Sequence, residues 1–99
     1  MSKTHRVEFS PLARRDLISL HDYIAAASGP AVARGYLDRI ERACEQLSLF
    51  PERGTLMAGH AGVRMIGFER RATLVFRVAR GRVEILRVLY GGRQSSGSD

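Results

Sequence analysis

The spacing of apolar residues along the chain changes from two to about 3.6 residues near position 10. At the start, Val7 and Phe9 alternate with polar residues, which is typical of a β-strand with one buried face, expected over His5–Phe9. After Ser10 and Pro11 the apolar residues recur at steps of four and three, which predicts an amphipathic helix. Ser10 suits the N-cap and Pro11 the first helical position. The helix should end near residue 27, with a stripe formed by Ala13, Leu17, Leu20, Ile24 and Ala27.

A second helix is predicted by the same pattern after a Ser28-Gly29-Pro30 break. Its stripe consists of Ala33, Leu37, Ile40, Cys44 and Leu47. The two helices should form a hairpin over residues 11–48, with the stripes facing each other. Cys44 lies within a stripe, so we expect a small core residue rather than a nucleophile.

Three strands are predicted after a loop at 52–61, because β-branched and aromatic residues are concentrated there. They are Val63–Phe68, Thr73–Val78 and Val83–Tyr90. Their short connections imply antiparallel neighbours. The order β-α-α-β-β-β therefore predicts an α+β fold in which a helical hairpin packs on a small antiparallel sheet.

The chain has 99 residues, of which 44% are hydrophobic, so it is long enough for one modest core. We expect a single domain over 1–93 and a flexible, Ser/Gly-rich tail over 94–99. No apolar run could span a membrane, no signal peptide is recognisable, and the single cysteine excludes an internal disulfide. A cytoplasmic protein is expected.

Positive charge is concentrated in the last third of the chain. Residues 1–61 carry 8 bases and 7 acids, whereas residues 62–93 carry 8 arginines against 2 glutamates, a net charge of +6. Such a surface favours an anionic partner: nucleic acid, a nucleic-acid-bound enzyme or an acidic segment. His5, His21 and His60 are far apart and have no cysteine ligands beside them, so neither a metal site nor a cofactor is expected.

Four segments together resemble a known family. They are Val83–Arg93, Val7–Ala13 with Asp16-Leu17, Leu47 with Phe50-Pro51, Gly54 and Val63-Arg64, and Leu74–Val78. Their order and spacing, over about residues 5–93, are similar to the ParE/RelE superfamily of bacterial toxins, and most similar to its ParE branch. The resemblance implies the toxin of a type II toxin–antitoxin system that inhibits DNA gyrase without catalysis. The contacts with the target would then be made by Arg64, Arg87, Tyr90 and Arg93.

The RelE branch implies an alternative, because its members are ribosome-dependent mRNA endonucleases. That chemistry needs a base, an acid and a group that stabilises the phosphorane. Arg64, His60 and Tyr90 are the candidates here, but the loop lacks the branch's lysine and no late tyrosine follows. A third possibility is a non-toxic relative that serves only to bind an antitoxin.

The resemblance also implies a ParD-like antitoxin as partner. Apolar residues beside the two helical stripes would form a groove for a partner's amphipathic helix. The candidate antitoxin-binding residues are Leu12, Ile18, Ala25, Val32, Tyr36 and Ala43. An acidic antitoxin segment that folds on binding would complement the basic sheet.

Overall fold

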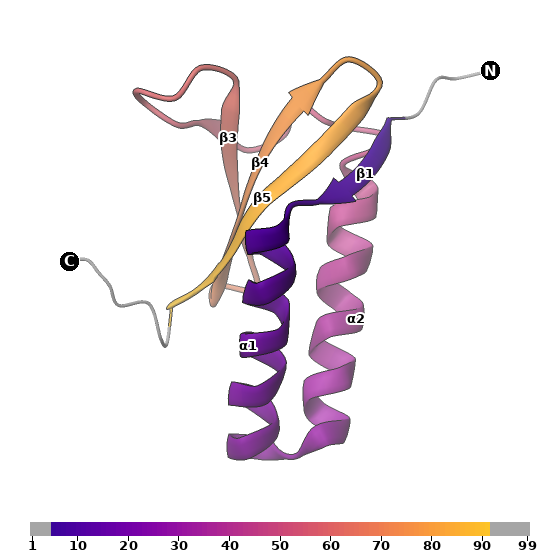
Figure 1. Cartoon of the computed structure of the whole chain (residues 1–99), viewed down its shortest axis with the longest axis vertical. Helices are drawn as coiled ribbons and strands as arrows, with labels where there is room; N and C mark the ends of the chain where they lie inside the picture. Colours follow the sequence, from indigo (N-terminus) through magenta and orange to yellow (C-terminus); the bar gives the residue numbers. More distant parts are fainter. Residues whose placement is uncertain (1–4, 92–99) are drawn as a thin grey trace.

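Two antiparallel helices pack on a five-stranded sheet in the computed structural model, which describes residues 5–91 (Figure 1). The elements are β1 (Arg6–Phe9), α1 (Pro11–Ser28), α2 (Pro30–Gln46), β2 (Thr55–Leu56), β3 (Val63–Phe68), β4 (Ala72–Ala79) and β5 (Arg82–Tyr90). The predicted α+β architecture is confirmed, and the predicted strands and helices agree with the observed ones to within two residues. Arg93 and the predicted tail at 94–99 lie outside the described residues.

The helix starts follow the predicted chemistry. The Ser10 hydroxyl oxygen accepts a hydrogen bond from the Ala13 N–H at 3.0 Å, and the hydroxyl donates to the Leu86 carbonyl at 2.9 Å. Ser10 therefore caps α1 and ties it to β5. Gly29 has a φ of 99°, and its N–H donates to the Ala25 carbonyl, which lets the chain reverse before Pro30. Within residues 5–91, neither helix is both long and apolar enough to cross a membrane.

The sheet is mixed, with strand order β1-β5-β4-β3-β2. The predicted antiparallel pairing is confirmed for β3, β4 and β5, whereas β1 pairs parallel to β5, with Val7 beside Val83. The helical hairpin and the three-stranded meander form a connection long enough to bring the last strand back beside the first in parallel. β2 lies inside the segment that was predicted to be a loop. The sequence does not predict this strand, because two residues are too few to show an alternating pattern.

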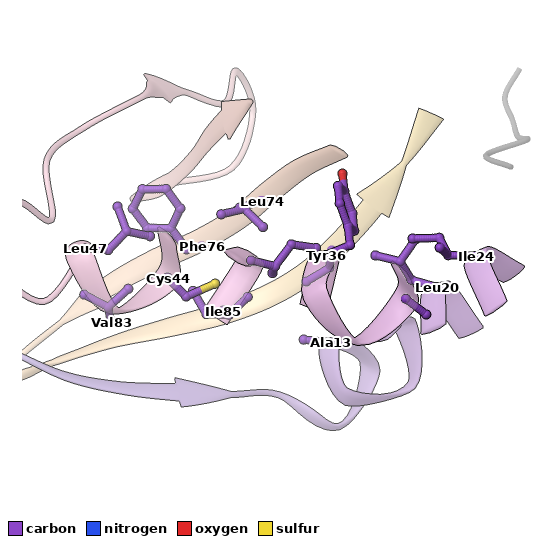
Figure 2. Close-up of a cluster of buried hydrophobic side chains, with 13 residues drawn as sticks. Ala13, Leu20, Ile24, Tyr36, Cys44, Leu47, Leu74, Phe76, Val83 and Ile85 are labelled. Atoms are coloured by element: carbon purple, nitrogen blue, oxygen red, sulfur yellow. The ribbon is translucent and has the colours of Figure 1, made fainter. Parts of the chain in front are cut away.

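The core lies between the hairpin and one face of the sheet, and Figure 2 shows its side chains converging there. Its fully buried members include Leu20, Ile40, Leu47, Leu74, Phe76, Val83 and Ile85. Cys44 is also fully buried, and burial raises the pKa of its thiol to about 12, which confirms a core role. Ala27, predicted in the α1 stripe, is exposed because the end of the hairpin extends beyond the sheet (Figure 1).

Candidate functional site

A β-bulge in β5 positions Arg87. Val75 of β4 lies opposite Arg87 and Phe76 lies opposite Ile85, so Leu86 is an extra residue on β5. The Arg87 guanidinium donates two hydrogen bonds to Asp16 of α1, at 2.7 and 3.0 Å, and this pair raises the arginine's pKa. Arg87 was predicted as a free target contact, but it is held in an internal ion pair that joins α1 to β5.

The other predicted target-contact residues lie at different places on the sheet. Arg64 of β3 donates a hydrogen bond to the backbone carbonyl of Glu52 at 2.9 Å, so its side chain is held against the loop before β2. Tyr90 ends β5 and is half-buried. His60 is exposed in the loop between β2 and β3, with its Nδ1 3.2 Å from the Ala58 carbonyl oxygen.

The candidate nuclease residues are not brought together. Tyr90 lies opposite Ala72, whereas Arg64 lies opposite Phe76, four residues further along β4. At about 3.3 Å per residue the Cα atoms of Arg64 and Tyr90 are separated by at least roughly 13 Å. A general acid and a base that share one phosphodiester must both lie within hydrogen-bond reach of it. In this structure the Arg64 guanidinium is held by the Glu52 carbonyl and the Tyr90 hydroxyl accepts a hydrogen bond from Arg71, so the two side chains have different partners.

Ion pairs neutralise much of the expected basic surface. Arg77 pairs with Glu84 at 3.2 Å, and Arg82 lies 3.7 Å from Glu8. Together with Arg87, three of the eight arginines in 62–93 thus have carboxylate partners. Within residues 5–91, the others without such a partner are Arg64, Arg70, Arg71 and Arg80. The unpaired positive charge therefore lies near the turns and strand ends rather than across the open face of the sheet.

The predicted antitoxin-binding residues divide into two groups. Leu12, Ile18 and Val32 are more than half exposed, as a partner-binding surface requires. Ala25 and Ala43 are partly buried against the core. Tyr36 is only 5% exposed, so its assignment to an exposed margin is wrong for the free chain. The stripe of α2 is wider than its spacing indicated, because the end of the sheet covers the flank that carries Tyr36.

Tyr36 belongs to an aromatic cluster at the end of the sheet. Its ring centroid lies 5.5 Å from that of Phe68 and 6.0 Å from that of Tyr90, both in edge-to-face geometry. Tyr23 of α1 contacts the other side of Tyr90, at 5.6 Å. Three tyrosines from two helices and one strand therefore meet at one place, although they are far apart in the sequence.

Charged residues surround this cluster and shape a pocket. Arg39 donates two hydrogen bonds to Glu69, at 2.7 and 3.1 Å, and its guanidinium lies 5.3 Å from the Tyr36 ring centroid. Arg71 donates to the Tyr90 hydroxyl at 3.4 Å. The pocket has a volume of about 670 Å³, and its remaining wall comes from the protruding end of the hairpin, mainly Ala27, Ser28, Ala31, Val32 and Gly35.

Sequence reasoning missed this pocket. Arg39 and Arg71 looked like ordinary solvated cations, and nothing in the helical periodicity placed Tyr36 beside Tyr90. The usable signal was the surplus of apolar residues beside the α2 stripe, which was read as an exposed groove. Among the described residues, no three His, Cys, Asp or Glu side chains gather as metal ligands would.

Comparisons with solved structures support the fold. A chain from the "Chromosomal ParDE TA system from P. aeruginosa" is 23% identical, with a TM-score of 0.78, and the match covers 90% of this chain and 98% of that one. A chain of the RelBE2 toxin–antitoxin complex from Mycobacterium tuberculosis is 30% identical, with a TM-score of 0.62, covering 88% and 98%. A chain of the E. coli DinJ–YafQ complex is 12% identical, with a TM-score of 0.55, covering 94% and 99%.

A comparison with curated protein sequences finds no match. The family model described as "ParE toxin of type II toxin-antitoxin system, parDE" matches residues 7–95, nearly the whole chain. That span contains the capped helical hairpin, the mixed sheet and the aromatic pocket. The chain therefore belongs to the ParE toxin family of type II toxin–antitoxin systems.

Proposed function

We propose that this ParE-family toxin inhibits DNA gyrase in the cytoplasm and is neutralised by a ParD-like antitoxin. The observation that carries the proposal is the family match over residues 7–95. ParE-like toxins are described as gyrase poisons, which need a shaped, cationic surface rather than an acid–base pair. The absence of the RelE branch's lysine from the loop at 52–61 supports a mode of action without catalysis.

The proposed target contact consists of Arg64, Tyr90 and Arg93, with Arg87 in a supporting role. Arg64 offers a half-exposed guanidinium, and Tyr90 stands at the end of β5. Arg87 holds β5 against α1 through Asp16, so its replacement would disturb the strand end as well as any direct contact. Single variants at Arg64 and Arg93 are therefore the cleaner probes of toxicity.

The exposed apolar side chains of the hairpin support an antitoxin partner. Leu12 is 52% exposed, Ile18 64% and Val32 53%, and each would lose water contact under an amphipathic helix. Burying the exposed half or so of one such side chain stabilises a complex by roughly 1–2 kcal/mol before the costs of association. The solved relatives described above come from toxin–antitoxin systems, which agrees with such a partner.

The proposal is tested by incubating the purified toxin with gyrase, ATP and supercoiled plasmid, followed by SDS and protease. Linear DNA that accumulates only with active toxin, and disappears when antitoxin is added first, is the expected result. Arg64→Gln should reduce linear DNA, whereas Arg80→Gln, an equal loss of charge in the β4–β5 turn, is the matched control. Undamaged plasmid at saturating toxin would contradict the proposed target.

An mRNA endonuclease of RelE type is the second candidate. It is favoured by the 30% identity to the chain from the RelBE2 complex. A parallel translation reaction with defined message distinguishes it from the first. Cut message with undamaged plasmid would make Arg64, His60 and Tyr90 the residues to replace.

A further inference from the structure

The hydroxyl of Tyr36 is an unsatisfied polar group at the aromatic pocket. Only 5% of the residue's surface is exposed, and within residues 5–91 its hydroxyl has no hydrogen-bond partner. Figure 2 shows the oxygen at the end of the ring that points away from the other labelled core side chains. A buried hydroxyl without a partner destabilises the free protein, and a ligand that accepts a hydrogen bond from it would remove that cost.

The cations around that hydroxyl are not equivalent. Arg39 is neutralised by its two hydrogen bonds to Glu69, whereas Arg71 has only the Tyr90 hydroxyl, and no carboxylate of the described chain lies within ion-pairing distance of it. The pocket thus offers one uncompensated positive charge. Arg71 is exposed, so its long side chain can move to admit a ligand.

The walls of the pocket fit a peptide better than a nucleic acid. The hairpin side consists of small and apolar residues, Ala27, Ala31, Val32 and Gly35, which permit close approach of another backbone. A nucleic-acid backbone would need several unpaired cations in a row, whereas of the two arginines that line this pocket only Arg71 lacks a carboxylate partner in the described chain.

We propose that the pocket formed by Tyr23, Tyr36, Arg39, Glu69, Arg71 and Tyr90 binds one carboxylate side chain of the antitoxin's docking segment. The carboxylate accepts hydrogen bonds from the Arg71 guanidinium and from the Tyr36 hydroxyl, while the apolar part of the segment covers Val32. This inference rests on the proposed antitoxin partner. It names the carboxylate side chain as the anchor, the group of the antitoxin that the pocket holds. It adds Arg71 to the candidate antitoxin-binding residues and gives Tyr36, already among them, a specific role for its hydroxyl.

The test uses the full-length chain and the purified protein encoded beside its gene, with affinity measured by calorimetry. Tyr36→Phe removes only the hydroxyl, and Arg71→Gln removes the positive charge together with the guanidinium donors. Each should weaken binding about tenfold or more, the effect of losing one hydrogen bond to a charged group. Arg80→Gln, at the opposite end of the sheet, is the control and should change affinity less than twofold.

Two further readouts separate the possible outcomes. Tyr36→Phe should leave the melting temperature of the free toxin unchanged or higher, because it removes an unsatisfied group. Replacing the antitoxin's acidic residues one at a time should reveal one whose effect vanishes in Arg71→Gln. If both toxin variants bind the antitoxin with unchanged affinity, the proposed anchor is wrong and the proposed partner stands. If the wild-type chain does not bind the antitoxin, both proposals are wrong. Loss of affinity for single-stranded DNA alone in Arg71→Gln would overturn the anchor in favour of nucleic acid.

Discussion

Replacing Asp16 with asparagine tests the contact between α1 and β5 most directly. The Asp16 carboxylate accepts two hydrogen bonds from Arg87 and a third, at 2.8 Å, from the backbone N–H of Val88. Its side chain is only 15% exposed, whereas that of Arg87 is 43% exposed, so solvent screens part of the interaction. Hydrogen bonds to charged groups contribute about 1.5–3 kcal/mol, and screening favours the lower half of that range. We expect Asp16→Asn to lower the free energy of unfolding by about 2 kcal/mol.

For a domain of this size, that loss corresponds to a melting temperature lower by roughly 8–16 °C. Thermal and urea unfolding followed by circular dichroism would measure it, with Asp22→Asn as the control, since Asp22 is 75% exposed on the same helix. The control should change stability by less than about 0.5 kcal/mol. Arg87→Ala should destabilise the chain as well, and less than additively with Asp16→Asn, because both remove the same pair. Equal midpoints for Asp16→Asn and the wild type would refute the reasoning.

Three other residues give sharp expectations. Gly54 has a φ of 81°, and a Cβ there would lie 2.3 Å from the Met65 carbonyl oxygen, so Gly54→Ala should destabilise by more than the roughly 1–2 kcal/mol of positive φ alone. Gly81→Ala, with open space around it, measures that strain separately by urea unfolding. The Cys44 thiol, buried and with its pKa raised to about 12, should react with a thiol reagent at pH 8 only as fast as the chain unfolds, and rapid labelling would contradict its core role. Burial, followed by the nearby Tyr90 and Glu69, raises the pKa of Tyr36 to about 12. The wild type should therefore lose stability between pH 10 and 12, because the tyrosine of the unfolded chain ionises first, and Tyr36→Phe should lack this part of the loss.

The helical hairpin could be predicted from the sequence because its determinants are local. Ser10 and Pro11 are adjacent to the turn that they start, and the apolar spacing repeats within four residues. The three consecutive strands were predictable for the same reason, since short turns leave little choice but antiparallel pairing. Gly81, with a φ of 72°, occupies the β4–β5 turn, where a glycine adopts a positive φ without strain.

The features that shape the site depend on contacts between distant residues. Asp16 and Arg87 are 71 positions apart. The bulge at Leu86 shifts the apolar alternation of β5, since Val83 and Ile85 are followed by Val88, but that shift does not specify the partner of Arg87. The parallel pairing of β1 with β5 likewise depends on where the whole chain returns, which no local pattern specifies. Tyr36 was predicted to lie on the second helix, which is correct, but it was expected to be exposed. It is buried because Phe68 and Tyr90, which are distant in the sequence, pack against it.

The position of the proposed anchor bears on how an antitoxin would neutralise this toxin. Arg71 and Tyr36 both contact Tyr90, which is also a proposed target-contact residue. A carboxylate held between Arg71 and Tyr36 would therefore bring the antitoxin segment onto Tyr90 itself, while Arg64 lies four residues further along the sheet. Neutralisation would then act by direct competition at the end of β5. It follows that Tyr36→Phe and Arg71→Gln should make the toxin harder to neutralise without reducing the contact that Arg64 makes, and that gyrase and antitoxin should not bind the strand end at the same time.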